Sequence, residues 1–332
     1  MGATLARGAG RLPYSRRVIA HPPVLDEIAR LAALATAQGA AVDVLATVDG
    51  LPIHAFRFGT ADRAAPALLV TGGIHGLERI GTEVAVAYLT TLIARLAWDA
   101  LLRDGLARCR VLCVPLVNPV GMARSQRANG NGVDLMRNAP PAPFGGTPLI
   151  GGQQLSPRLP YYMGRAGAPM EVEAAALVGF VERELFPAPF AIALDLHSGY
   201  GLVDRIWYPY ARTREPPPDA RAIALLGRLL DDTLPNNVYR VEQTAQAYTI
   251  RGDLWDHLYD RRRAAGPGAL LPLTLEMGSW AWVRKNPRQG LSTLGRFNPV
   301  VPHRLRRTLR RHLPLVDFLF HAAASHCNWL VP

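Results

Sequence analysis

Apolar and polar positions follow two different periods along this chain. Four short runs are almost wholly apolar, and they cover residues 66–71, 109–117, 190–196 and 270–276. Runs of this length without alternation are typical of strands that are buried on both faces of a sheet. Two further short strands are predicted at residues 41–48 and 52–58.

Between these strands, apolar residues recur every three or four positions. The pattern predicts helices over residues 23–38, 80–97, 170–186, 219–233, 252–263 and 303–324. Alternating helices and buried strands predict an α/β fold in one domain, with a mixed, twisted β-sheet and helices on both faces. We expect this domain to span residues 21–332, after an N-terminal arm of residues 1–20. Residues 139–168, rich in Pro and Gly, are expected to form a long surface loop.

The charge of the chain is strongly positive, at +11. Lys285 is the only lysine, so arginine carries nearly all of this charge. The densest run, residues 303–313, alternates leucines and arginines in the way of a helix with one apolar stripe and a solvated basic face. We therefore expect no nucleic-acid partner, and an anionic substrate fits the charge equally well.

The chain has no apolar run of membrane-spanning length, and its N-terminus lacks the apolar centre of a secretory signal. We therefore expect a cytoplasmic protein without a membrane partner. Three cysteines are too few for a disulfide framework. Cys109 and Cys113 fall on one side of a predicted strand, so we expect them to be small core residues.

Three of the buried strands end in histidine or acidic residues. His75 and Glu78 follow the first strand, Asp195 and His197 end another, and Glu276 ends the last. Ligands of open α/β sheets bind beyond the carboxyl ends of the strands, so these side chains are expected to converge. Two histidines and a glutamate match one catalytic zinc set with an open fourth position. A remaining carboxylate is suited to take a proton from water.

Five motifs in order resemble the zinc carboxypeptidases of the carboxypeptidase A type, with their bacterial relatives and the related aspartoacylases and succinylglutamate desuccinylases. The motifs are GGIHGLE, VNPVGMARSQRANGNGVDLMRN, DLHSG, YTIRGDLWDHLY and LTLEMG, within residues 40–300. Carboxypeptidase A is itself a known His–His–Glu zinc enzyme. The resemblance implies a zinc carboxypeptidase-like (phosphorylase/hydrolase-like) fold and one zinc ion per chain.

The resemblance also implies roles for individual residues. His75, Glu78 and His197 would bind zinc, and Glu276 would be the general base and proton shuttle. Arg127 would polarise the scissile carbonyl and Arg137 would bind the substrate's terminal carboxylate. The remaining expected site residues are Tyr248 as a hydrogen-bond donor to substrate, Asp134 and Asp195 as residues that orient the ligands, and Met136 and Asn129 beside the substrate carboxylate.

Met136 departs from the pattern of the resembled family. The box reads Asp134-Leu135-Met136-Arg137, where the family has Asp-Leu-Asn-Arg. A thioether cannot donate a hydrogen bond, so carboxylate binding is expected to weaken by about 1–3 kcal/mol unless another group replaces the amide. The candidate replacements are Asn129, Asn131, Asn138 and Arg124.

These features predict a zinc-dependent metallocarboxypeptidase that hydrolyses a C-terminal peptide bond with water activated by zinc and Glu276. The nearer alternative is a zinc-dependent deacylase of N-acyl amino acids, which Met136 and the expected cytoplasmic location favour. Either substrate carries a carboxylate. The more distant alternative is a non-catalytic basic binding module on the same scaffold. The sequence leaves the oligomeric state open.

Overall fold

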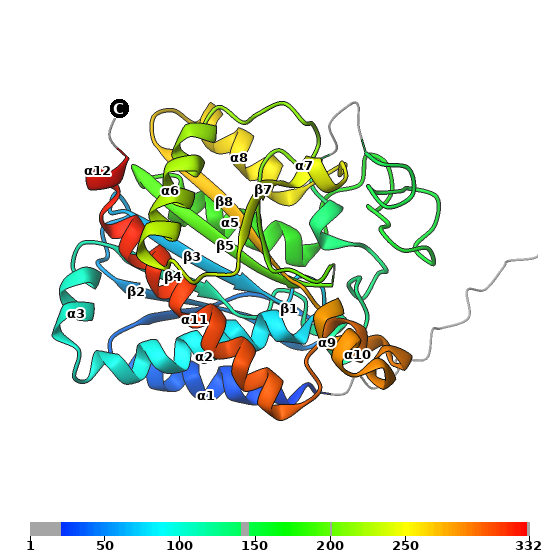
Figure 1. Ribbon diagram of the computed structural model, residues 1–332, viewed down its shortest axis with the longest axis horizontal. Helices are drawn as coiled ribbons and strands as arrows, with labels where there is room; N and C mark the ends of the chain where they lie inside the picture. The colour runs from blue at the N-terminus through cyan, green and yellow to red at the C-terminus, as the bar shows by residue number, and fades with distance from the viewer. Residues whose placement is uncertain (1–20, 141–145, 200, 331–332) are drawn as a thin grey trace, which may run out of the picture.

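The computed structural model describes residues 21–140, 146–199 and 201–330, so the predicted N-terminal arm lies outside the described residues. One eight-stranded sheet runs through the described part of the chain, with the strand order β1-β2-β4-β3-β5-β8-β6-β7 (Figure 1). The strands are β1 (Ala41–Val48), β2 (Leu51–Gly59), β3 (Ala67–Gly72), β4 (Arg110–Val114), β5 (Phe190–Ser198), β6 (Arg205–Tyr208), β7 (Arg240–Gln243) and β8 (Ala269–Met277).

The centre of the sheet is parallel and its margins are mixed. Strands β4, β3, β5 and β8 run parallel to one another. On one side β2 is antiparallel to both β4 and β1, and on the other side β6 is antiparallel to β8. The predicted mixed sheet is therefore confirmed. The parallel register places Asp195 opposite Thr71, and His197 opposite Glu276.

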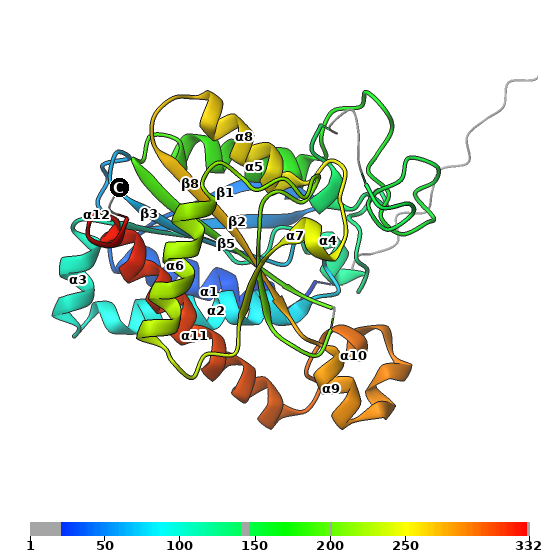
Figure 2. The same ribbon diagram turned by 45° about the horizontal axis from the view of Figure 1, so that its top comes forward.

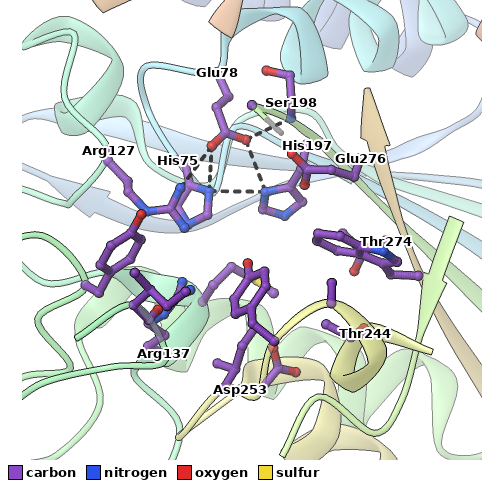
Figure 3. A pocket seen from close by; sticks show the side chains of 18 of the residues that line it. His75, Glu78, Arg127, Arg137, His197, Ser198, Thr244, Asp253, Thr274 and Glu276 are labelled. Carbon is purple, nitrogen blue, oxygen red and sulfur yellow. Dashed lines mark hydrogen bonds and ion pairs between the residues drawn. The ribbon is translucent and has the colours of Figure 1, made fainter. Parts of the chain in front are cut away.

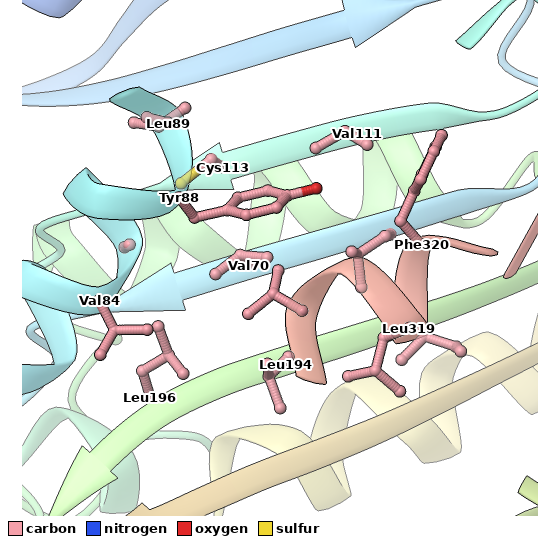
Figure 4. Packing of buried hydrophobic residues seen from close by; sticks show 14 of the residues in the cluster. Val70, Val84, Tyr88, Leu89, Val111, Cys113, Leu194, Leu196, Leu319 and Phe320 are labelled. Carbon is pink, nitrogen blue, oxygen red and sulfur yellow. The ribbon is translucent and has the colours of Figure 1, made fainter. Parts of the chain in front are cut away.

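Helices cover both faces of the sheet (Figures 1 and 2). On one face, α1 (Pro23–Ala37), α2 (Arg79–Leu96), α6 (Ala220–Thr233) and α11 (Pro302–Ala324) pack into a large apolar core. Figure 4 shows this core where Tyr88 of α2 and Phe320 of α11 meet Val70 of β3. On the other face, α5 (Val172–Leu185) and α8 (Leu254–Ala264) pack into a second, smaller core.

The long predicted elements agree with the structure to within a few residues, and Cys109 and Cys113 are buried free thiols as expected. Residues 146–168 form no helix or strand. Sequence patterns missed the short elements: α3 (Ala100–Leu106), α4 (Pro119–Ala123), α7 (Thr244–Ala247), α9 (Trp280–Lys285), α10 (Thr293–Phe297), α12 (His326–Trp329), the 3-10 turns Leu135–Arg137 and Pro287–Leu291, and strands β6 and β7.

Within the described ranges, no single helix has the length and hydropathy needed to cross a membrane. Only α2 and α3 together pass that test, and the pair is bent by 108°.

Candidate metal centre

The turn between β3 and α2 carries His75 and Glu78 to the carboxyl edge of the sheet. Gly73 lies in the left-handed region with φ +65°, which glycine adopts without steric cost. Gly76 passes so close to α4 that a Cβ atom there would lie 2.0 Å from the carbonyl carbon of Gly121. The turn is therefore tight, and it directs the side chains of His75 and Glu78, three residues apart in the sequence, toward the same place.

His75, Glu78 and His197 converge there, as their strand positions predicted (Figure 3). Glu78 Oε1 lies 3.0 Å from His75 Nδ1 and Glu78 Oε2 lies 3.2 Å from His197 Nδ1. The two Nδ1 atoms are 3.1 Å apart. Two nitrogens that bind one tetrahedral zinc ion at 2.0–2.1 Å are separated by about 3.3 Å. The donor set and its spacing thus fit zinc.

The other ring nitrogen of each histidine faces a carboxylate. His75 Nε2 lies 3.1 Å from Asp134 Oδ1, and His197 Nε2 lies 2.6 Å from Asp195 Oδ2. An Nε2–H group donated to a carboxylate leaves the Nδ1 lone pair facing the cluster. Asp134 and Asp195 therefore orient both rings for a metal on the Nδ1 side.

Burial and neighbouring charges shift the ionisation of this cluster strongly. Burial raises the pKa of Glu78, but the adjacent His75 and His197 outweigh it and hold that pKa well below its usual range. For Asp134, burial is outweighed by Arg127 and Arg137, so its pKa is also far below the ordinary value. Burial lowers the pKa of His197, but Asp195 and Glu78 raise it well above normal. The cluster therefore keeps its carboxylates ionised, as a cation requires.

Glu276 lies beside the cluster at the end of β8 (Figure 3). It is paired in register with His197 and is 8% exposed. Both residues line a cavity of about 670 Å³. A carboxylate at this place can exchange protons with a water molecule or an amine held in the cavity.

Two arginines form one wall of the cavity and are joined through Asp134. Arg127 donates from Nε to Asp134 Oδ2 (2.9 Å) and from Nη1 to Glu78 Oε1 (3.2 Å). Arg137 donates from Nη1 to the same Asp134 oxygen (3.0 Å) and from Nη2 to the carbonyl of Ile150 (3.0 Å). Asp134 thus links the orientation of His75 to that of both guanidinium groups.

Tyr161 was missed by the sequence analysis. Its ring centroid lies 5.2 Å from the guanidinium carbon of Arg127 and 4.7 Å from that of Arg137, within cation–π range. Its φ of +64° is unusual for a tyrosine, and its carbonyl accepts a hydrogen bond from the backbone of Gln153. The only signal for it was its place in the long 139–168 loop.

Met136 and Tyr248 line the cavity, but Asn129 does not. The Asn129 amide donates to Glu171 and Glu173, and its oxygen accepts backbone N–H groups of residues 131 and 133. The structure thus places Asn129 outside the cavity lining, where its hydrogen bonds hold the loop before Asp134. Asn131, Asn138 and Arg124, the other three candidates to replace the missing amide, also lie outside the cavity lining.

The rest of the cavity is largely apolar, with several aromatic rings and a few polar groups. Tyr248 packs edge-on against Trp207, with ring centroids 6.0 Å apart, and burial raises its pKa. Away from the metal cluster, the lining includes Thr244, Asp253, Trp255, Asp256 and Thr274. Asp256 accepts backbone hydrogen bonds from Ala211 and Arg212, so it also ties α8 to the segment after β6.

The fold and this cluster define the class: an α/β protein with a buried His–Glu–His cluster that can hold a metal ion, at the carboxyl edge of a mixed sheet. Residues 28–281 match the family described as zinc carboxypeptidase. Because the match covers well over half of the chain, the protein belongs to the zinc carboxypeptidase family.

Curated relatives agree with this assignment. Mouse carboxypeptidase A4 is 26% identical over 233 residues, which are 64% of this chain and 53% of the relative. Rat carboxypeptidase A1 is 27% identical over 196 residues, which are 55% of this chain and 44% of the relative. The chain thus spans about half the length of the curated relatives it matches.

Solved structures share the fold. Thrombin activatable fibrinolysis inhibitor superposes with a TM-score of 0.68 at 18% identity, covering 90% of this chain and 74% of that one. Carboxypeptidase A from Helicoverpa armigera gives a TM-score of 0.67 at 19% identity, covering 90% and 72%. The predicted fold class and family resemblance are both confirmed.

Proposed function

We propose that this protein is a zinc-dependent metallocarboxypeptidase that hydrolyses the C-terminal peptide bond of its substrate. The observation that carries the proposal is Asp134, which joins the metal cluster to two arginines on one cavity wall. The cluster that can bind a metal cation and the arginines that can bind an anion are thereby held at a fixed distance from each other. A peptide end, with a carboxylate one residue away from a scissile amide, matches that pair of sites.

Each group in the cavity has a role in this proposal. His75, Glu78 and His197 would hold one zinc ion, which when bound supplies a Lewis acid for the carbonyl and acidifies water. Glu276 takes the proton of the attacking water and returns it to the leaving amine. Arg127 stabilises the negative charge that develops on the carbonyl oxygen. Arg137 binds the substrate carboxylate, and the Tyr248 hydroxyl donates a hydrogen bond to the bound substrate.

The alternative, a deacylase of N-acyl amino acids, is favoured by Met136. This side chain lines the cavity and stands where the family sequence has an asparagine, and among the described residues that line the cavity there is no asparagine or glutamine. An N-acyl amino acid also has a carboxylate beside its amide, so the same wall would hold it. The two proposed substrates differ in what is joined to the nitrogen of the terminal amino acid: a peptide chain in one, and a short acyl group in the other.

Mass spectrometry of a mixed pool of peptides and N-acyl amino acids, incubated with and without a zinc chelator, separates these proposals. We expect chelator-sensitive loss of single C-terminal residues from peptides. Cleavage of the N-acyl amino acids alone would assign the deacylase activity instead. If protein shown to hold zinc cleaves neither class, the proposed substrate class is wrong.

Glu276→Gln tests catalysis against simple binding. The variant is expected to keep its zinc, because Glu276 is not a ligand, and to lose at least 100-fold in kcat because the proton acceptor is gone. Unchanged turnover would contradict the role of Glu276. Peptide binding without turnover in the unmodified protein would favour the basic binding module.

A further inference from the structure

Asp195 is a carboxylate with an unusual set of partners. It is 0% exposed, in the centre of the sheet, and within the described ranges no arginine or lysine forms an ion pair with it. The Thr71 hydroxyl donates to Oδ1 at 2.7 Å. The indole Nε1 of Trp255 and Nε2 of His197 both lie close to Oδ2, at 2.9 and 2.6 Å. Two neutral donors and one imidazole therefore stabilise this buried charge.

The carboxylate that orients the other histidine is held differently. Asp134 accepts from the guanidinium groups of Arg127 and Arg137, in addition to a backbone N–H group. Charged donors stabilise a buried carboxylate about twice as strongly as neutral ones. Within the described ranges Asp195 has no guanidinium donor, so the hydrogen bonds from Thr71 and Trp255 account for a larger share of its orientation.

Trp255 connects Asp195 to the substrate cavity. It lies in the first turn of α8, where Asp253 caps the helix by accepting the backbone N–H groups of residues 255 and 256. Its ring lines the cavity and is nearly fully buried. One side chain thus forms part of the cavity wall and donates to the carboxylate that orients His197.

We infer that Trp255 is a positioning residue for the metal centre, acting through Asp195 on the ring orientation and Nε2–H tautomer of His197. This inference rests on the proposed role of His197 as a metal ligand. Without the indole N–H, Asp195 Oδ2 keeps only His197 as a donor, and the Thr71 hydroxyl on Oδ1 is then the one other side-chain donor in the described residues that fixes the rotation of the carboxylate. The Nδ1 lone pair of His197 is then aimed less well at the metal.

Trp255→Phe tests this inference, with Trp207→Phe as the matched control. Trp207 is equally buried and lines the same cavity, but its indole donates to Glu242 at 3.1 Å. The readout is the zinc dissociation constant, measured by competition with a chelator. We expect Trp255→Phe to weaken zinc binding about 10-fold, Asp195→Asn to weaken it up to about 100-fold, and Trp207→Phe to change it less than twofold.

A second variant removes only the N–H group. Replacing Trp255 with β-(3-benzothienyl)alanine keeps the ring shape, so any loss of zinc affinity is assigned to the hydrogen bond rather than to packing. The imidazole Nε2–H proton of His197, observed by NMR, should move upfield in this variant. If both Trp255 variants bind zinc as tightly as Trp207→Phe does, the inference is overturned. If the unmodified protein binds no zinc, the proposed metal site itself is wrong.

Discussion

Met136 is the residue at which this cavity differs from the family pattern described above. Met136→Asn restores a donor to the wall beside Arg137, and a hydrogen bond to a charged group contributes about 1.5–3 kcal/mol. We expect the KM for peptides to fall about 10-fold with little change in kcat. Steady-state kinetics of Met136→Asn and of the apolar control Met136→Leu measure this effect. Equal KM values in both would show that the wall does not contact the carboxylate.

Tyr161 holds two guanidinium groups against one ring. Each cation–π contact contributes about 0.5–1 kcal/mol at such a site, so loss of the ring is expected to raise KM about 5- to 10-fold. Tyr161→Leu tests this by steady-state kinetics. Tyr161→Phe is the control, because it keeps the aromatic face. If Phe and Leu behave alike, the hydroxyl or the loop conformation, and not the ring, is responsible.

At the scale of elements, the β3–α2 turn depends on a close backbone approach to α4. Gly76→Ala would place a Cβ atom 2.0 Å from the carbonyl carbon of Gly121, so the turn must move. We expect a loss of several kcal/mol in the free energy of unfolding, together with loss of zinc binding. Gly179→Ala in α5 is the control: it has no neighbour within 4 Å and should stabilise by about 0.5–1 kcal/mol. Denaturant unfolding measures both.

Helix α11 contains a buried histidine that makes stability depend on pH. Burial lowers the pKa of His312 to about 4, an effect that nearby Arg311 reinforces and Asp204 opposes. The unfolded chain, with a histidine pKa near 6.5, binds more protons than the native state between these two values. The contribution of neutral His312 to the free energy of unfolding is therefore fully present above pH 6.5. It is lost as the pH drops from 6.5 to about 4.

The loss over that range is expected to reach about 3 kcal/mol. Unfolding curves at pH 7 and pH 4.5 should show a smaller difference for His312→Gln than for the unmodified protein. Both proteins keep Tyr239, whose hydroxyl lies 3.0 Å from His312 Nδ1 in the unmodified protein, so the comparison changes only the histidine. An equal pH response in both proteins would exclude His312 as its source.

For the whole molecule, a zinc ion that binds only the native state stabilises it by mass action. Zinc at 100 times its dissociation constant should raise the free energy of unfolding by about 2.7 kcal/mol. Thermal unfolding with and without chelator measures this increment. His75→Ala should abolish it, and a persistent increment in that variant would place the zinc elsewhere.

Buried parallel strands gave the clearest signal in this sequence, because they need almost wholly apolar runs. Their carboxyl ends share an edge, so His75, Glu78, His197 and Glu276 were predictable as neighbours. Strands β6 and β7 were not, because four-residue strands with mixed polarity resemble loops. Tyr161 and Trp255 depend on loop conformation and helix packing, for which periodicity carries no information.

The order of strands in the sheet has a consequence for synthesis of the protein. Residues that line the cavity extend from His75 to Phe297, and β8 joins β5 only after some 70 intervening residues have been made. Contacts so distant in sequence form slowly. A chain released from the ribosome before β8 would carry the three candidate zinc ligands without Glu276. Such a chain would also lack the strand that pairs with β5 beside His197, so the cavity is completed only when β8 has been made.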